Sequence, residues 1–178
     1  QWLEEAQALN NLNGVDQTTH RLFVEELEVS LALESCALHE WSFSPRSNFL
    51  GFANYLVELH PLRTMEDSEA LFTRTRALPA WLDARLSTLR AGLSKGLVVN
   101  AASTEKVIEM VQTQLQQAQP DWPELQFDCN NEPCLSESQQ KSLREQYNKL
   151  REDVLIDALK VYLAFLTDEV LPQARGPE

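Results

Sequence analysis

A stripe of leucines over residues 82–97 constrains the fold more than any other feature of this sequence. Successive leucines are four, three, four and four residues apart, so their side chains fall on one face of an α-helix. The stripe consists of Leu82, Leu86, Leu89, Leu93 and Leu97. Such a face is stable only when other elements cover it, because exposed leucine side chains are costly in water. We therefore predict that this helix packs in the core.

The composition extends this helical prediction to the whole chain. The sequence has 178 residues, of which 43% are apolar, and this is enough for one domain with a hydrophobic core. Glycine is scarce, with 5 residues, and β-branched residues seldom stand in runs. We predict a single helical domain over residues 1–178, an all-α, antiparallel array of about six to seven helices with one long C-terminal helix.

Local signals set the boundaries of the predicted helices. Thr64 with Asp67, and Ser136 with Gln139, have the spacing of a capping box. Pro79 is expected to end one helix and open the next, because it lacks the N–H that a helix interior uses. The expected helices cover residues 1–11, 16–40, 50–59, 64–78, 79–97 and 136–171. A further helix is expected to begin at residue 103 and to end within residues 114–119.

Single residues refine these helices. Asp16 and Ser103 are expected to act as N-caps. Gly96 suits a C-terminal cap, and Gly92 permits a close approach by a neighbouring backbone. Trp2 is expected to anchor the first helix by packing.

The last predicted helix and the loop before it are unusual. The second half of the helix, residues 155–170, is apolar on several sides, so it must be deeply buried. We expect part of this surface to be covered by polypeptide outside the chain. Residues 119–135 form the long loop insertion, and we expect Trp122 and Phe127 to pin it to the body rather than to bind a ligand.

The charge excludes some partners. With 27 acidic against 15 basic residues the net charge is −12, which argues against nucleic acid as a ligand. No run of about 18 apolar residues is present, so no membrane span is expected. The acidic excess is greatest in residues 1–60, and we interpret it as a solvated helix face.

The cysteines bear on localisation. Cys129 and Cys134 bracket a turn-rich segment in which a disulfide closes without strain, and such a bridge suits a secreted or periplasmic protein. The alternative is a pair of free thiols in a cytosolic protein. Cys36 lies in a helical pattern and is expected to be a small buried residue. The sequence opens on Gln1 rather than Met, so we also expect proteolytic processing.

No catalytic or metal-binding motif emerges from the residues. His20, His39 and His60 are far apart, and none has a second ligand at helical spacing. His39 and Glu40 begin the zinc pattern H-E-x-x-H, but Phe43 stands where the second histidine is needed. We therefore predict no catalytic residue and no metal ligand in this chain.

Several motifs resemble one bacterial family. They are R-x-R-A-L-P-A-W-L at 74–82, L-R-x-G-L-x-x-G-L-V at 89–98 and E-K-V at 105–107, flanked by L-x-x-x-H-P-x-R-T at 56–64 and Y-L-A-F-L-x-x-x-V-L-P-x-A-R at 162–175. Together they resemble the family called domain of unknown function 885, whose members are similar to gluzincin-type zinc metallopeptidases. The 119–135 loop departs from the family pattern, and so does the 98–103 segment, which lacks a proline common there.

The resemblance implies that this chain is the N-terminal helical half of a larger protein. In the family the zinc-binding helix lies downstream of the position that matches Arg175, so zinc is expected in the missing catalytic part and the chain alone is predicted to be inactive. The implied partners are a second polypeptide that carries the catalytic half, and a peptide substrate.

Two functions remain open for such a chain. The first is one wall of the substrate cleft of a zinc-metallopeptidase-like hydrolase, and the alternative is a stand-alone helical module that binds another protein. We favour the first because we expect the last helix to need an outside burial partner. The polar residues expected to face the cleft are Arg46, Ser47, Asn48, His60 and Arg63. A purely structural role is the alternative for each.

Overall fold

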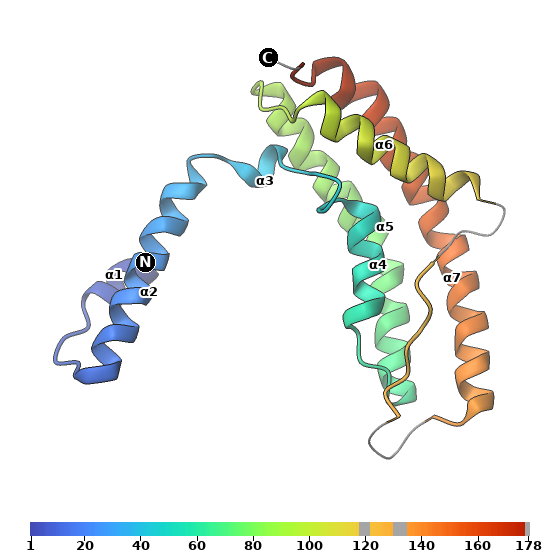
Figure 1. The fold of residues 1–178 in the computed structure, drawn as a ribbon, viewed down its shortest axis with the longest axis horizontal. Helices are drawn as coiled ribbons and strands as arrows, with labels where there is room; N and C mark the ends of the chain where they lie inside the picture. Colours follow the sequence, from blue (N-terminus) through green and yellow to red (C-terminus); the bar gives the residue numbers. More distant parts are fainter. Residues whose placement is uncertain (118–121, 130–134, 177–178) are drawn as a thin grey trace. The chain divides into compact units, whose positions relative to one another are not determined.

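A computed structural model of the chain describes residues 1–117, 122–129 and 135–176. Within these ranges the chain forms seven α-helices and no strand, and the helices include a long one near the C-terminus (Figure 1). The all-α prediction is therefore confirmed. No helix among these residues is long and apolar enough to cross a membrane. The chain divides into two compact units, Gln1–His39 and Glu40–Glu178, which are described separately.

The first unit is a helical hairpin of α1 (Trp2–Gln7) and α2 (Gly14–Glu34). The imidazole Nε2 of His20 lies 2.7 Å from the carbonyl oxygen of Ala6 and ties the two helices together. Asn13, not Asp16, is the N-cap of α2, and Asp16 lies in the first turn. The helix ends earlier than predicted, and Ala37 beyond it has a left-handed φ of 47°.

Several burial predictions for the first unit are wrong. No residue of α2 is buried. Trp2 is 71% exposed and does not anchor α1, and Cys36 is exposed rather than buried. The hairpin contributes one buried hydrophobic residue, Ala6. A short hairpin has too little surface to enclose a core, so an amphipathic sequence pattern does not by itself bury a face.

The second unit contains two hydrophobic cores. After α3 (Leu38–Trp41) come α4 (Phe49–Leu59), α5 (Met65–Ser94), α6 (Ala101–Gln116) and α7 (Glu137–Ala164). Helices α5 and α7 pack along each other, with α4 and α6 beside them (Figure 1). From the leucine stripe, Leu82, Leu86 and Leu89 are buried, and the same core contains Leu155, Leu159 and Tyr162 of α7. Each fully buried leucine stabilises the fold by roughly 1.5–3 kcal/mol.

Helix α5 runs through Pro79, so the predicted break at Leu78 is wrong. Proline removes one backbone hydrogen bond from a helix interior. Apolar residues on both sides of it, Leu71 and Leu78 before and Leu82 after, are buried in the same helix. This burial outweighs the lost bond, so one long helix replaces the two that were expected.

Capping residues determine where α5, α6 and α7 begin. Both predicted capping boxes are present: Thr64 with Asp67 begins α5, and Ser136 with Gln139 begins α7. Helix α6 is capped by Asn100, whose side chain accepts from the N–H of Ser103, so the predicted cap at Ser103 is wrong.

The two glycines near the end of α5 act as predicted. A Cβ on Gly92 would lie 2.1 Å from the carbonyl oxygen of Glu40, so that backbone approaches as only glycine allows. Gly96 follows the helix with a left-handed φ of 76°.

Helix α7 continues through a π-helix (Phe165–Val170) and a 3₁₀ turn (Leu171–Gln173). Its apolar second half is buried by its own neighbours α4, α5 and α6, with Phe165, Leu166 and Val170 in the core. Val161 on the same stretch is 49% exposed, so the expectation that outside polypeptide covers part of this surface stays a prediction. The chain after it pairs with the start of α6, where Arg175 donates to Val99 and accepts from the Ala101 N–H.

The described part of the loop between α6 and α7, residues 122–129 and 135, is not helical. Trp122 and Leu125 are buried, which confirms that Trp122 pins the segment to the body. The buried Arg151 of α7 donates to the carbonyl oxygen of Pro123 at 2.7 Å, and its guanidinium lies 5.4 Å from the Trp122 ring centroid. Burial lowers the pKa of Arg151 to about 10, so the group stays charged at neutral pH.

Candidate ligand-binding pocket

A hollow of about 190 Å³ lies in the second unit, between the start of α4, the middle of α5 and the end of α7. Its walls come from the loop before α4 and from three helices. The lining residues are Ser42, Phe43, Ser47, Asn48, Phe49, Phe52, Trp81, Leu82, Arg85, Leu89 and Tyr162.

Aromatic rings form one wall of the pocket. Trp81 stacks on Phe52 with ring centroids 4.6 Å apart and on Phe49 at 6.1 Å. Phe49 in turn meets Tyr162 edge to face at 5.9 Å. Trp81 is 42% exposed and Phe52 43%, so this wall is open to solvent on one side while Phe49 and Tyr162 are buried. Contacts of this kind hold the rings in place and leave aromatic surface available to a ligand.

The polar groups lie against this wall. The guanidinium of Arg85 donates from Nη2 to the carbonyl oxygen of Ser42 at 2.8 Å. Desolvation by burial lowers the pKa of Arg85, while the nearby Tyr162 raises it. Burial raises the pKa of the Tyr162 hydroxyl, so it stays protonated at neutral pH. The pocket thus holds one cation beside a neutral phenol.

A tight turn positions the loop side of the pocket. Ser44 and Ser47 exchange two backbone hydrogen bonds of 3.0 Å around Pro45 and Arg46. The amide of Asn48 donates to Ser44 and Pro45 at 3.1 and 3.0 Å, and its oxygen accepts from the N–H of Gly51. Asn48 therefore caps α4 and locks the turn together, which fixes Ser47 at the pocket edge.

The structure places two of the five predicted cleft residues at this pocket, Ser47 and Asn48. Arg46 is exposed at the tip of the turn, outside the lining. His60 and Arg63 lie beyond the other end of α4, which spans about 16 Å at 1.5 Å per residue. The five residues therefore do not form one site.

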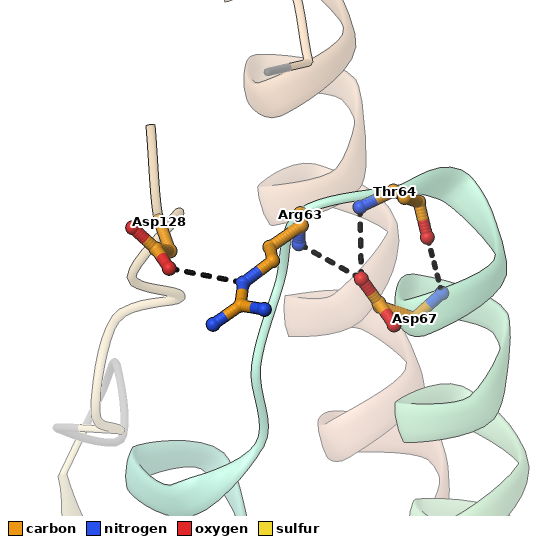
Figure 2. Close-up of polar contacts among 4 residues, drawn as sticks. All are labelled: Arg63, Thr64, Asp67 and Asp128. Atoms are coloured by element: carbon orange, nitrogen blue, oxygen red, sulfur yellow. Dashed lines mark hydrogen bonds and ion pairs between the residues drawn. The ribbon is translucent and has the colours of Figure 1, made fainter. Parts of the chain in front are cut away.

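His60 and Arg63 belong to the junction between α4 and α5. His60 is buried, with Nε2 2.8 Å from the carbonyl oxygen of Asp67 and Nδ1 in contact with the guanidinium of Arg74. Because a carbonyl oxygen only accepts, Nε2 carries the proton and Nδ1 accepts from Arg74. Figure 2 shows Arg63, whose Nε donates to Asp128 at 3.0 Å and whose backbone N–H donates to Asp67.

The pocket residues that lie on the helices were not predicted from the sequence. Arg85 was not among the predicted cleft residues, yet it lines the pocket with Trp81. A signal was present, because Trp81 and Arg85 are four residues apart and such residues are neighbours on a helix surface. Phe52 and Tyr162 come from other helices, and only the tertiary packing brings them to the same pocket as Trp81.

The described residues do not fit a zinc ion. Within the described ranges no group of three or more His, Cys, Asp or Glu side chains could hold a metal. Cys129 is described and its Sγ lies 3.4 Å from the Nε2 of Gln140. Cys134 lies outside the described residues, so the predicted bridge between Cys129 and Cys134 stays a prediction.

The fold and the pocket define a helical protein with a small, partly aromatic pocket that one cationic side chain lines. Comparison with protein families identifies it further: the family described as "Bacterial protein of unknown function (DUF885)" matches residues 1–178, and the chain belongs to this family. No curated protein matches the chain.

Proposed function

We propose that this chain is a non-catalytic part of a zinc-metallopeptidase-like hydrolase and forms one wall of its substrate cleft. In this proposal the zinc ligands belong to polypeptide outside these 178 residues, and the substrate is a peptide. The observation that carries the proposal is the pocket in which Ser47 and Asn48 lie beside Trp81 and Arg85.

The size and lining of the pocket suit a single side chain. An apolar cavity of about 150 Å³ holds one benzene molecule, so about 190 Å³ accommodates one aromatic or aliphatic side chain. Most ligand pockets combine apolar walls with a few placed polar groups, as Trp81 and Phe52 do here with Arg85 and Ser47. A peptide would bury a side chain there and keep its backbone at the open edge.

The test uses the native protein in which these residues occur, purified whole. It should cleave peptides, and removal of zinc should abolish the activity. Because Trp81 contacts the bound side chain and not the reacting bond, Trp81→Ala should raise KM about tenfold with little change in kcat. Trp2→Ala, which removes an exposed tryptophan from the other unit, is the control and should leave both constants unchanged. An intact protein without zinc-dependent peptidase activity would refute the proposal.

A second function, a stand-alone module that binds another protein, has one observation in its favour. Helix α2 leaves large apolar side chains exposed, namely Val15, Leu22, Phe23, Val29, Leu31 and Leu33. Native mass spectrometry separates the two proposals. A co-purifying chain with H-E-x-x-H supports the hydrolase, whereas a homogeneous, zinc-free species of 20.3 kDa supports the module.

The secreted or periplasmic location also belongs to this proposal, and the cysteine spacing supports it. Titration of thiols in the denatured protein provides the check, because three reactive thiols would remove the argument for export.

A further inference from the structure

From the chemistry of the same pocket we infer its ligand class: an apolar ring or chain that ends in a carboxylate, as in the C-terminal residue of a peptide or a small arylalkyl acid. This inference rests on the proposed function where the ligand is a peptide. It names the chemical group that the pocket selects.

The charge of the pocket lining favours an anionic ligand. Arg85 is the one charged side chain among the residues that line the pocket, and no aspartate or glutamate is among them. The whole chain has a net charge of −12, so this lining differs in sign from the molecule around it. An anionic ligand is therefore attracted locally, and a cation is repelled.

The geometry of α5 sets the spacing between the aromatic and the cationic group of the pocket. Trp81 and Arg85 are one helical turn apart, and side chains at this spacing have Cβ atoms about 5–6 Å apart. A ligand whose ring and carboxylate are separated by two or three bonds spans the same gap. Its ring would lie along Trp81 and Phe52, and its carboxylate would meet Arg85.

The polar surroundings of Arg85 favour this orientation. The hydrogen bond from Nη2 to the carbonyl oxygen of Ser42 orients the guanidinium, whose planar, forked N–H groups match the geometry of a carboxylate. The N-terminal end of α4 at Phe49 also lines the pocket and adds the positive end of a helix dipole. An exposed aromatic wall alone would also attract cations, but Arg85 opposes them.

The experiment compares three ligands that share one ring: 3-phenylpropanoate, 3-phenylpropanamide and 3-phenylpropylamine. Binding to the full 178-residue chain is measured by NMR titration of the backbone amides of the pocket residues. We expect the carboxylate to bind about tenfold more tightly than the amide and the amine to bind most weakly, because a charge-assisted bond to Arg is lost. Equal or tighter binding of the amide or the amine overturns the inference.

Variants assign the preference to Arg85. Arg85→Gln should weaken binding of 3-phenylpropanoate about tenfold and leave the amide unchanged. Arg76→Gln, which neutralises an exposed arginine of the same helix outside this pocket, should keep the full preference. Because Arg85 also holds Ser42, Arg85→Lys is measured alongside, and this folded, charged variant should still prefer the acid over the amide. A preference that survives in Arg85→Gln, or reverses in Arg85→Lys, overturns the assignment.

Peptides distinguish the two sources of the carboxylate. The tripeptide Ala-Ala-Phe is compared with its C-terminal amide and with 3-phenylpropanoate. Tighter binding of the free peptide supports both the carboxylate pocket and the peptide role. Binding of the small acid alone supports the carboxylate pocket and contradicts the peptide role, whereas equal binding of both peptides supports the peptide role and overturns the carboxylate inference.

Discussion

At the scale of single residues, the absence of a side chain can matter as much as its presence. Gly92 is buried in α5, where an added Cβ would lie 2.1 Å from the carbonyl oxygen of Glu40. Gly51 in α4 is different, because its added Cβ would meet only side-chain atoms of Asn48, at 3.9 Å. The same substitution therefore has opposite consequences in the two helices.

We predict that Gly92→Ala lowers the free energy of unfolding by about 1–3 kcal/mol, the usual cost of overpacking, although alanine is the better helix former. Gly51→Ala is the matched control and should be neutral or stabilising by up to about 1 kcal/mol. Urea denaturation of the three proteins provides the measurement. If both variants were equally stable, the close approach between Gly92 and Glu40 would be disproved.

At the scale of elements, the caps of α5 and α7 could be read from the sequence, because each depends on residues three positions apart. The leucine stripe could be predicted for the same reason, because its spacing is a pattern within one helix. The passage of α5 through Pro79 could not be predicted, since the local preference of proline was overruled by packing on both sides of it. The pocket residues also differ in how far the sequence predicts them. Ser47 and Asn48 belong to a turn that could be recognised in the sequence, whereas Tyr162 lines the pocket only because of how α7 packs.

The cap of α5 gives a prediction on pH. The carboxylate of Asp67 accepts from the backbone N–H groups of Arg63 and Thr64 at 3.0 and 2.9 Å, and these bonds lower its pKa below 3.8 (Figure 2). A carboxyl group with a lower pKa in the folded than in the unfolded protein stabilises the fold at pH values above its unfolded pKa. This contribution is lost as the pH falls through the pKa of the folded protein.

We therefore expect the free energy of unfolding to fall as the pH drops below about 4, and to fall less steeply in Asp67→Asn. Asp83→Asn, on the same helix but away from the cap, is the control and should keep the slope of the unsubstituted protein. Unfolding curves at a series of pH values provide the test, and equal slopes for all three proteins would exclude Asp67 as a source of acid sensitivity.

At the scale of the whole molecule, the hydrophobic cores belong to the second unit. Both clusters of buried apolar residues draw their members from Phe43 onward, and the one buried apolar residue of the α1 and α2 hairpin, Ala6, belongs to neither cluster. Isolated helices are marginal in water without tertiary packing. The amphipathic pattern of α2 could be read from the sequence, but its exposure could not, because exposure depends on what the rest of the fold offers to cover it.

A chain shortened to residues 40–178 should therefore fold on its own. We expect its helical circular dichroism per residue to match the full chain, and its free energy of unfolding to stay within about 1 kcal/mol, because both cores are retained. A peptide of residues 1–39 should be largely unfolded by the same measurement, since too little apolar surface is buried to offset the entropy of ordering the chain. A shortened chain that lost cooperative unfolding would mean that the first unit is needed for the cores to form, and the pocket could then no longer be assigned to the second unit alone.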